Sequence, residues 1–127
     1  MIAAGVILCD DLIFVSKVQG TARAHGIGMI QAKTVEAALA TAATIHATGV
    51  IVDIHHTGLN WFTFMPSLAN LLNRPNVIAF GSHVDVKALK AAREAGCDRV
   101  MPRSQFVKEL EEELPKWLAV RAEAPAE

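Results

Sequence analysis

The sequence lacks the features that mark several large classes of protein. Its 12 Lys and Arg residues are balanced by 13 Asp and Glu residues, which leaves a net charge of −1 and no positive field for general nucleic-acid binding. The longest uninterrupted apolar run, from Met1 to Cys9, is too short to span a bilayer, and no basic leader accompanies it. These absences predict a soluble, cytoplasmic protein that binds neither membranes nor nucleic acids.

Cysteine and the short motifs of common enzymes are equally scarce. Cys9 and Cys97 are the only cysteines, and they form no CxxC motif, which indicates free thiols in a reducing compartment rather than a disulfide framework. The chain contains no GxSxG motif and no HExxH motif, and neither cysteine has an assigned histidine base. Because no nucleophile–base pair typical of hydrolases is present, we expect a protein that is not an enzyme.

Apolar residues, by contrast, make up 52% of the chain, in runs that alternate between strand and helix spacing. Short apolar runs predict strands, and longer stretches with apolar residues three or four positions apart predict helices. The expected strands are 4–9, 28–32, 49–54, 76–81 and 98–102. The expected helices are 12–25, one capped by Thr34, one ending near Pro75, 83–96, and one from Ser104 that Pro115 should kink or split.

The alternation of strands with helices indicates a single α/β domain. We expect a parallel five-stranded sheet between two layers of helices, in the flavodoxin-like strand order 2-1-3-4-5. The domain should occupy residues 1–120, and the segment 121–127, which has no apolar periodicity, should be a disordered tail. Such sheets bind ligands beyond the carboxyl ends of their strands, so the residues at those ends are the candidates for a site.

Acidic side chains follow two of the expected strands. Asp10 and Asp11 come directly after the first strand, and Asp53 ends the third. These strands are neighbours in the order 2-1-3-4-5, so the carboxylates should share one rim, with Arg103 across from them. Three carboxylates in one concavity favour a hard divalent cation such as Mg²⁺. The alternative for Asp10 and Asp11 is a helix start, where negative charge is stabilised by the helix dipole.

At these positions the sequence resembles the receiver domains of two-component response regulators. The resemblance rests on the acidic pair, on the lone Asp53 and on the segment AAREAGCDRVMPRS, and it covers nearly the whole chain. It implies a CheY-like fold in which Asp10, Asp11, Asp53 and the backbone carbonyl of His55 hold Mg²⁺. It also implies that Asp53 is the phosphoacceptor.

The sequence departs from the receiver pattern at the positions that respond to phosphorylation in receivers. Gly81 stands where receivers carry a switch Thr or Ser, with Ser82 one position late, and Arg103 stands where they carry Lys. Gly81 has no hydroxyl, and a guanidinium does not replace an ammonium at such a site. We expect Arg103 to bind an anion or Asp53, and Ser82 to cap the next helix. The chain therefore looks like an atypical receiver, or pseudo-receiver.

Three histidines support an alternative function. His55, His56 and His83 map to the same rim, and with the nearby carboxylates they could bind Zn²⁺ or another transition metal. No histidine spacing in the sequence distinguishes such ligands from solvated loop histidines. The alternative is therefore a metal-dependent enzyme or metalloprotein that uses this rim.

The segment NWFTFMPSLANLL gathers four large apolar residues, Trp61, Phe62, Phe64 and Met65. A helix has one inward face, so they form either a locally thick core or an interaction patch on the surface. Together with the resemblance, the patch predicts a stand-alone signalling or interaction module. Its partner would be a protein, such as a histidine kinase or a downstream effector, or a second copy of the chain in a homodimer.

Overall fold

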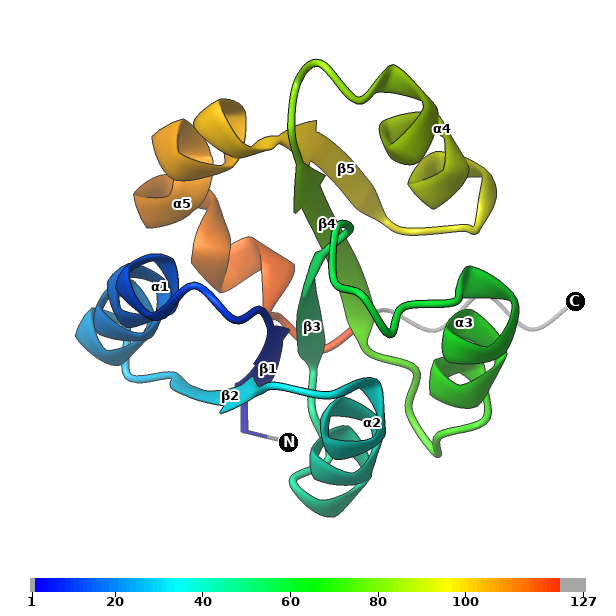
Figure 1. Ribbon diagram of the computed structural model, residues 1–127. Coiled ribbons are helices and arrows are strands. Elements are labelled where there is room, and N and C mark those ends of the chain that lie inside the picture. The colour runs from blue at the N-terminus through cyan, green and yellow to red at the C-terminus, as the bar shows by residue number, and fades with distance from the viewer. Residues whose placement is uncertain (1, 122–127) are drawn as a thin grey trace, which may run out of the picture.

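The computed structural model describes residues 2–121, which form a five-stranded parallel sheet and five helices (Figure 1). The strands are β1 (Ala4–Leu8), β2 (Gly28–Ala32), β3 (Gly49–Asp53), β4 (Asn76–Gly81) and β5 (Arg99–Pro102). The helices are α1 (Leu12–Ala24), α2 (Val35–Thr44), α3 (Trp61–Ala69), α4 (Val86–Glu94) and α5 (Arg103–Trp117). Most of the predicted tail, residues 122–127, lies outside the described residues.

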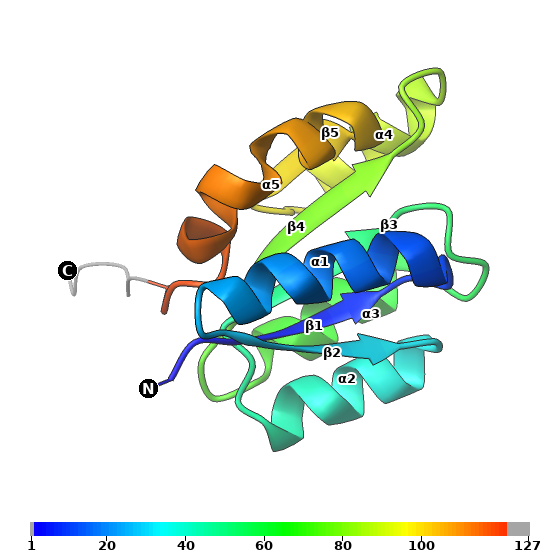
Figure 2. The same cartoon turned by 90° about the vertical axis from the view of Figure 1, so that its left-hand side faces the viewer.

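The strand order is β2-β1-β3-β4-β5, as predicted, and every neighbouring pair is parallel. Helices α1 and α5 cover one face of the sheet, and α2, α3 and α4 cover the other (Figures 1 and 2). The chain reverses its direction of travel across the sheet after β2, so that β1 and β3 become neighbours. The topological switch point, where ligands of such folds bind, therefore lies between the ends of these two strands.

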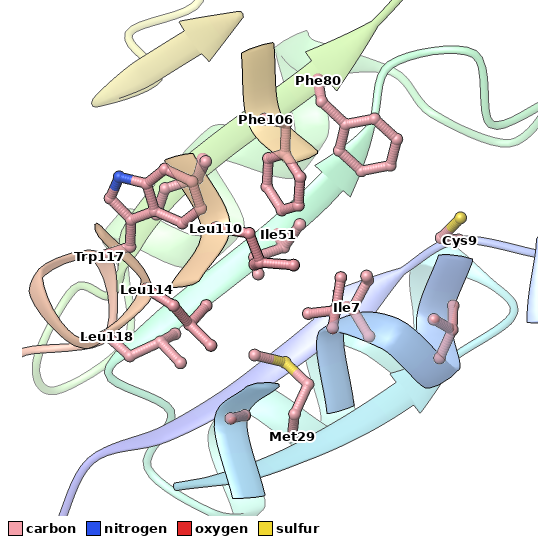
Figure 3. Close-up of a cluster of buried hydrophobic side chains, with 14 of the residues drawn as sticks. Ile7, Cys9, Met29, Ile51, Phe80, Phe106, Leu110, Leu114, Trp117 and Leu118 are labelled. Atoms are coloured by element: carbon pink, nitrogen blue, oxygen red, sulfur yellow. The ribbon is translucent and has the colours of Figure 1, made fainter. Parts of the chain in front are cut away.

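The three central strands are buried on both faces, which explains their nearly continuous apolar sequences. On the α1/α5 side, Phe14, Phe80, Phe106 and Trp117 form a chain of aromatic contacts with ring centroids 4.6 to 5.4 Å apart. Figure 3 shows the apolar side chains of α5 pointing from this side toward the sheet. The residues predicted to face inward from the last helix are all buried: Phe106, Leu110, Leu114, Trp117 and Leu118.

The end of α5 lies so close to the starts of the strands that a side chain at one position there would be crowded. A Cβ atom at Gly49 would lie 2.3 Å from Leu118 Cδ2 and 3.0 Å from the Trp117 carbonyl oxygen. The buried Thr48 hydroxyl donates to the Leu118 carbonyl oxygen at 2.6 Å and accepts the Ala4 N–H at 3.0 Å. The first strand, the third strand and the last helix are thus joined at this edge of the sheet.

Helix α5 continues through Pro115 as one element, so the predicted split does not occur. Proline cannot donate to the carbonyl four residues earlier, which belongs to Glu111. His25 Nε2 lies 3.1 Å from that Glu111 carbonyl oxygen and supplies the missing donor from the end of α1. The position of Pro115 near the end of the helix, together with this replacement bond, lets the helix reach Trp117.

Helix α3 ends at Ala69, earlier than the predicted end near Pro75. The segment after Asn70 turns back toward β4, and Arg74 anchors it by donating to the Gly96 carbonyl oxygen at 3.1 Å and to Asp98 Oδ2 at 2.9 Å. A helix limited only by Pro75 could have continued further. Instead α3 ends at Ala69, and the hydrogen bonds that Arg74 donates hold the segment that follows it.

Two glycine-to-alanine substitutions should have opposite effects on stability. Gly49→Ala should destabilise the protein by about 1–3 kcal/mol, because its Cβ has no space against Leu118. Gly20→Ala, at an exposed position of α1 with nothing within 4 Å of the new Cβ, should stabilise it by about 0.5–1 kcal/mol through helix propensity. Urea unfolding of both variants measures this, and equal effects would contradict the close packing at Gly49.

Candidate functional site

The residues predicted to form a site follow the carboxyl ends of the strands, which lie together at one edge of the sheet (Figure 2). Asp10 and Asp11 follow β1, Asp53 ends β3, and Arg103 begins α5. A hollow of about 600 Å³ opens there. It is lined by Asp53, His55, Phe80, Gly81, Ser82, His83, Arg103, Ser104 and Val107. The structure therefore brings together the carboxylates, the histidines and the arginine that the sequence placed at strand ends.

Arg103 pairs with Asp11 rather than with Asp53, the carboxylate expected to be its partner. Its Nη2 lies 2.7 Å from Asp11 Oδ2, and its guanidinium carbon lies 4.3 Å from the centroid of the Phe14 ring. The aromatic face attracts the cation and the carboxylate orients it. The long, planar guanidinium is thus held over Phe14 of α1, and although it lines the same hollow as Asp53 it forms no ion pair with that residue.

Asp11 is the N-cap of α1, as the helix-start alternative predicted. Its Oδ1 accepts the Phe14 N–H at 3.1 Å, and its Oδ2 accepts from Arg103. The hydrogen bond from Phe14, followed by the bond from Arg103, lowers the pKa of Asp11 below that of an ordinary aspartate. Both of its oxygens are therefore engaged within the protein.

Asp10 lies beside His56. His56 Nε2 is 3.8 Å from Asp10 Oδ2 and 2.7 Å from the Lys33 carbonyl oxygen, while His56 Nδ1 accepts the Gly58 N–H at 3.2 Å. The His56 ring is almost fully buried, with 6% of its side chain exposed. Because both ring nitrogens serve backbone groups, His56 is a structural link between two loops. The expectation of a metal ligand or a solvated histidine is wrong for this residue.

Asp53 is partly buried at the end of β3. Its Oδ1 accepts the backbone N–H of His55 at 2.9 Å, and its Oδ2 lies 3.9 Å from the Sγ atom of buried Cys9. Burial, and then the negative charge of Asp53, raise the pKa of the Cys9 thiol. Cys9 is therefore a protonated core thiol, and one oxygen of Asp53 is left without a strong hydrogen-bond donor.

The side chain of His55 connects the loop after β3 to the loop after β4. Its Nε2 accepts the Ser82 N–H at 2.9 Å, and its Nδ1 lies 3.8 Å from Asp85 Oδ2. A Cβ atom at Gly81 would lie 2.3 Å from Ile54 Cδ1 and 3.0 Å from His55 Nε2. Serine or threonine at position 81 would therefore require the Ile54 side chain to move and the His55 ring to shift by a few tenths of an ångström. Sequence reasoning assigned the backbone carbonyl of His55 to Mg²⁺ and offered its ring as a transition-metal ligand or a solvated group, and it missed this role, which no sequence spacing signals.

Ser82 does not cap α4, contrary to expectation. The N-cap is Asp85, whose Oδ1 accepts the Ala88 N–H at 3.0 Å. The Ser82 hydroxyl oxygen instead lies 3.4 Å from the Val84 N–H, a weak contact inside the loop. The loop occupies the residues up to Asp85, so the helix starts one turn later than the sequence suggested.

The donor set for Mg²⁺ is only partly suitable. Asp10 and Asp53 each keep an oxygen without a strong donor, but Asp11 is engaged by Phe14 and Arg103. Among the described residues, no group of three His, Cys, Asp or Glu side chains is placed to hold a metal ion. Mg²⁺ can be bound through two carboxylates with retained waters. The arrangement therefore fits a weak site without Asp11, and offers no support for a metal-dependent enzyme.

The four residues of the predicted interaction patch separate in the structure. Phe62 is 91% exposed, and Trp61 is half-buried at the same end of α3. Phe64 and Met65 are buried in the core between α3 and the sheet, so their assignment to the patch is wrong. The helical period turns Phe64 inward and leaves Phe62 outside.

A second hollow, of about 630 Å³, lies between α3 and α4 next to Phe62. Its lining residues are mainly apolar or small: Trp61, Phe62, Met65, Pro66, Ala69, Arg74, Ala91, Glu94, Ala95 and Gly96. Arg74 and Glu94 supply one charge of each sign at its margin. The exposed aromatic ring and the groove together form one apolar surface, called here the α3/α4 surface.

The fold matches solved structures of receiver domains. A response regulator from Chloroflexus aurantiacus superposes with a TM-score of 0.76 at 20% identity, covering 94% of this chain and 99% of that one. The non-phosphorylated HemR receiver domain from Leptospira biflexa gives 0.76 at 13% identity, covering 96% and 98%. The chemotaxis response regulator CheY4 of Vibrio cholerae gives 0.72 at 14% identity, covering 93% and 100%. The predicted CheY-like receiver fold is thus confirmed.

Sequence comparison adds no closer assignment, since no protein-family model and no curated protein matches the chain. Within residues 2–121, no helix has both the length and the apolar character needed to cross a membrane.

Substitutions at Asp11 should lose their effect in acid. Because its folded-state pKa is lowered, the contacts of Asp11 stabilise the protein above the ordinary aspartate pKa, and this contribution is lost as the pH falls through the folded-state value. At neutral pH we expect Asp11→Ala to be less stable than Asp11→Asn, which keeps a capping oxygen, and both to be less stable than wild type. Asp10→Asn should change stability less, because Asp10 is not the cap of a helix. Denaturant unfolding at neutral and acidic pH tests this, and a difference independent of pH would contradict it.

Proposed function

We propose that the protein is a receiver-type signalling and protein-interaction module with a retained acidic pocket and a degenerate phosphorylation switch. The observation that carries the proposal is the filled space above Gly81. The side chains of Ile54 and His55 occupy the place where a hydroxyl-bearing side chain would have to project. The similarity to receiver structures supports the general class, and the rim of this chain supports the degenerate switch.

A working receiver, as the resemblance implies, uses a lysine and a hydroxyl to bind the phosphoryl group and draw in the loop after β4. Here Arg103 already holds Asp11 and stacks on Phe14. The Ser82 amide is bonded to His55, and its hydroxyl lies one residue late. A phosphoryl group on Asp53 would have to break these contacts before it could move the loop. The contacts of Arg103 and Ser82 therefore oppose movement of the loop after β4 on phosphorylation.

Asp53 remains the candidate phosphoacceptor, because it is accessible from the hollow and keeps one oxygen without a strong donor. Asp10, Asp53 and the His55 carbonyl group would hold Mg²⁺ weakly, with Asp11 withdrawn by Arg103. A bound Mg²⁺ would neutralise the carboxylates and orient phosphoryl oxygens. The two free cysteines suit a cytoplasmic location.

The α3/α4 surface is the proposed docking surface for a protein partner. Its exposed aromatic side chain, Phe62, is of the kind enriched at interfaces. Helix α3 carries no charged residue, and the groove margin carries one Arg and one Glu, so the surface suits an apolar segment. A kinase, an effector or a second copy of the chain could supply that segment, and solution measurements of assembly distinguish them.

A phosphoryl mimic should leave the loop after β4 in place. With millimolar Mg²⁺ and beryllofluoride, we expect only small amide shifts at residues 81–86, because His55 and Arg103 are already engaged. Two-dimensional NMR of wild type, with Asp53→Asn as the control that cannot bind the mimic at Asp53, makes the measurement. Large shifts spreading from Asp53 through Ser82 into α5 in wild type alone would indicate a working switch.

Phe62→Ser should weaken association with little loss of stability. A side chain that is 91% exposed should change the free energy of unfolding by no more than about 0.5 kcal/mol when replaced. The matched control, Phe64→Ala, removes a fully buried ring and should cost about 3–5 kcal/mol. Sedimentation analysis and denaturant unfolding measure the two effects. Unchanged self-association and unchanged capture of a purified partner in Phe62→Ser would contradict the docking surface.

A further inference from the structure

The carboxylate of Asp98 holds two arginines that come from distant parts of the chain. Its Oδ2 accepts from Arg74 Nη1 at 2.9 Å and from the Val77 N–H at 2.7 Å, and its Oδ1 accepts from Arg121 Nη1. Burial opposes the charge of this carboxylate, but the hydrogen bonds from Arg121, Val77 and Arg74 outweigh it and lower its pKa. Asp98 is therefore ionised, and it fixes Arg121, the last residue that the structure describes, to the side of the domain.

These three charged side chains lie at one end of the groove of the α3/α4 surface. Arg74 and Gly96 both line the groove, and Arg74 Nη2 donates to the Gly96 carbonyl oxygen at 3.1 Å. The guanidinium that shares Asp98 with Arg121 is thus part of the groove wall. The residues that follow Arg121 in the sequence therefore start beside the groove.

The segment after Arg121 is long enough to extend over most of the groove. The groove runs from Arg74 and Gly96 to Phe62 at the start of α3. The nine residues of α3 span about 13 Å along the helix axis. The sequence continues after Arg121 with AEAPAE, residues 122–127, and six extended residues span about 20 Å.

The side chains of the segment suit the walls of the groove. Small residues form both walls, Pro66 and Ala69 on α3 and Ala91 and Ala95 on α4. Four of the six residues in AEAPAE are alanine or proline, which fit a narrow apolar slot. The proline disfavours a helix interior and favours an extended backbone.

The charge at the end of the groove also suits the segment. Arg74 and Arg121 carry two positive charges against the single negative charge of Asp98, so one net positive charge remains there. Glu123, two residues after Arg121 in the sequence, carries the opposite sign, and attraction between them favours entry of the segment at this end. Glu94 at the groove margin is paired with a lysine of α4, which offsets its repulsion.

We propose that residues 122–127 bind in the groove of the α3/α4 surface as an extended segment, anchored by the pair of Arg121 with Asp98. The inference rests on the docking role proposed for this surface and adds its regulation, because a partner has to displace the segment before it docks. A tethered segment has an effective concentration in the millimolar range. A weak intrinsic affinity is therefore enough for the segment to occupy the groove.

NMR of the full chain and of a variant that ends at Arg121 tests the contact in the absence of any partner. Removal of residues 122–127 should shift the amide signals of Met65, Ala69 and Ala91, which line the groove, because their apolar neighbour is lost. The N-acetylated peptide AEAPAE, added at millimolar concentration to the shortened variant, should move the same signals toward their full-chain positions. Spectra at several protein concentrations detect a second copy as the occupant, because its contribution grows with concentration.

Two full-length variants keep the test decisive if the shortened variant does not fold. Arg121→Gln removes the charge of the anchor, and Ala124→Asp places a carboxylate against apolar walls, so both should give the groove signals of the undocked segment. The matched control is Arg99→Gln, which removes an arginine from a different ion pair, with Glu109 at 2.9 Å. It should leave the groove signals at their wild-type positions.

Association through the α3/α4 surface should be at least about threefold tighter in the shortened variant, because no segment has to be displaced. Equal association, groove signals that are identical in the full and shortened chains, or signal differences that depend on protein concentration would each overturn the inference. Failure of the docking surface itself has a different signature. In that case Phe62→Ser leaves association unchanged while the groove signals still respond to removal of the segment.

Discussion

The pairing of Arg103 with Asp11 above the Phe14 ring is the interaction on which the arrangement of the rim depends. It joins the start of α5 to the start of α1, the two helices that share one face of the sheet. An exposed ion pair of this kind contributes little to stability. Its importance is geometric, because it holds the cation over the aromatic contacts and pairs it with Asp11 instead of Asp53.

The other rim loops are held by histidines in a comparable way. His56 joins the loops after β2 and β3 through backbone groups of Lys33 and Gly58, and His55 joins the loops after β3 and β4 through the Ser82 amide. The acidic pair is thereby divided, with Asp10 beside His56 and Asp11 bonded to Arg103. The rim is organised by internal partners, in a place where the receiver pattern leads one to expect a metal ion and a phosphoryl group.

The opposite edge of the sheet has a different character. There the end of α5 rests on Gly49, and the Thr48 hydroxyl and the Asn76 side-chain amide bond its last carbonyl groups. These contacts are buried or tightly packed and they hold the last helix to the sheet. Because this edge is tightly packed, a small change in free energy is more able to move the loops at the rim than the end of α5.

The sequence by itself determined the five strands, the five helices, their order in the sheet and the gathering of Asp10, Asp11, Asp53 and Arg103 at one edge. The strands and helices follow from local periodicity, and the strand order and the gathering at one edge follow from the flavodoxin-like order expected for this alternation; neither needs knowledge of side-chain contacts. The tertiary structure alone decided that Arg103 binds Asp11, that His55 holds Ser82, that Asp85 caps α4 and that Phe64 is buried while Phe62 is exposed. Each of these depends on distances between groups remote in sequence, or on the rotation of a helix about its axis. A difference of a few ångströms decides which partner a long side chain reaches, and sequence spacing does not contain that distance.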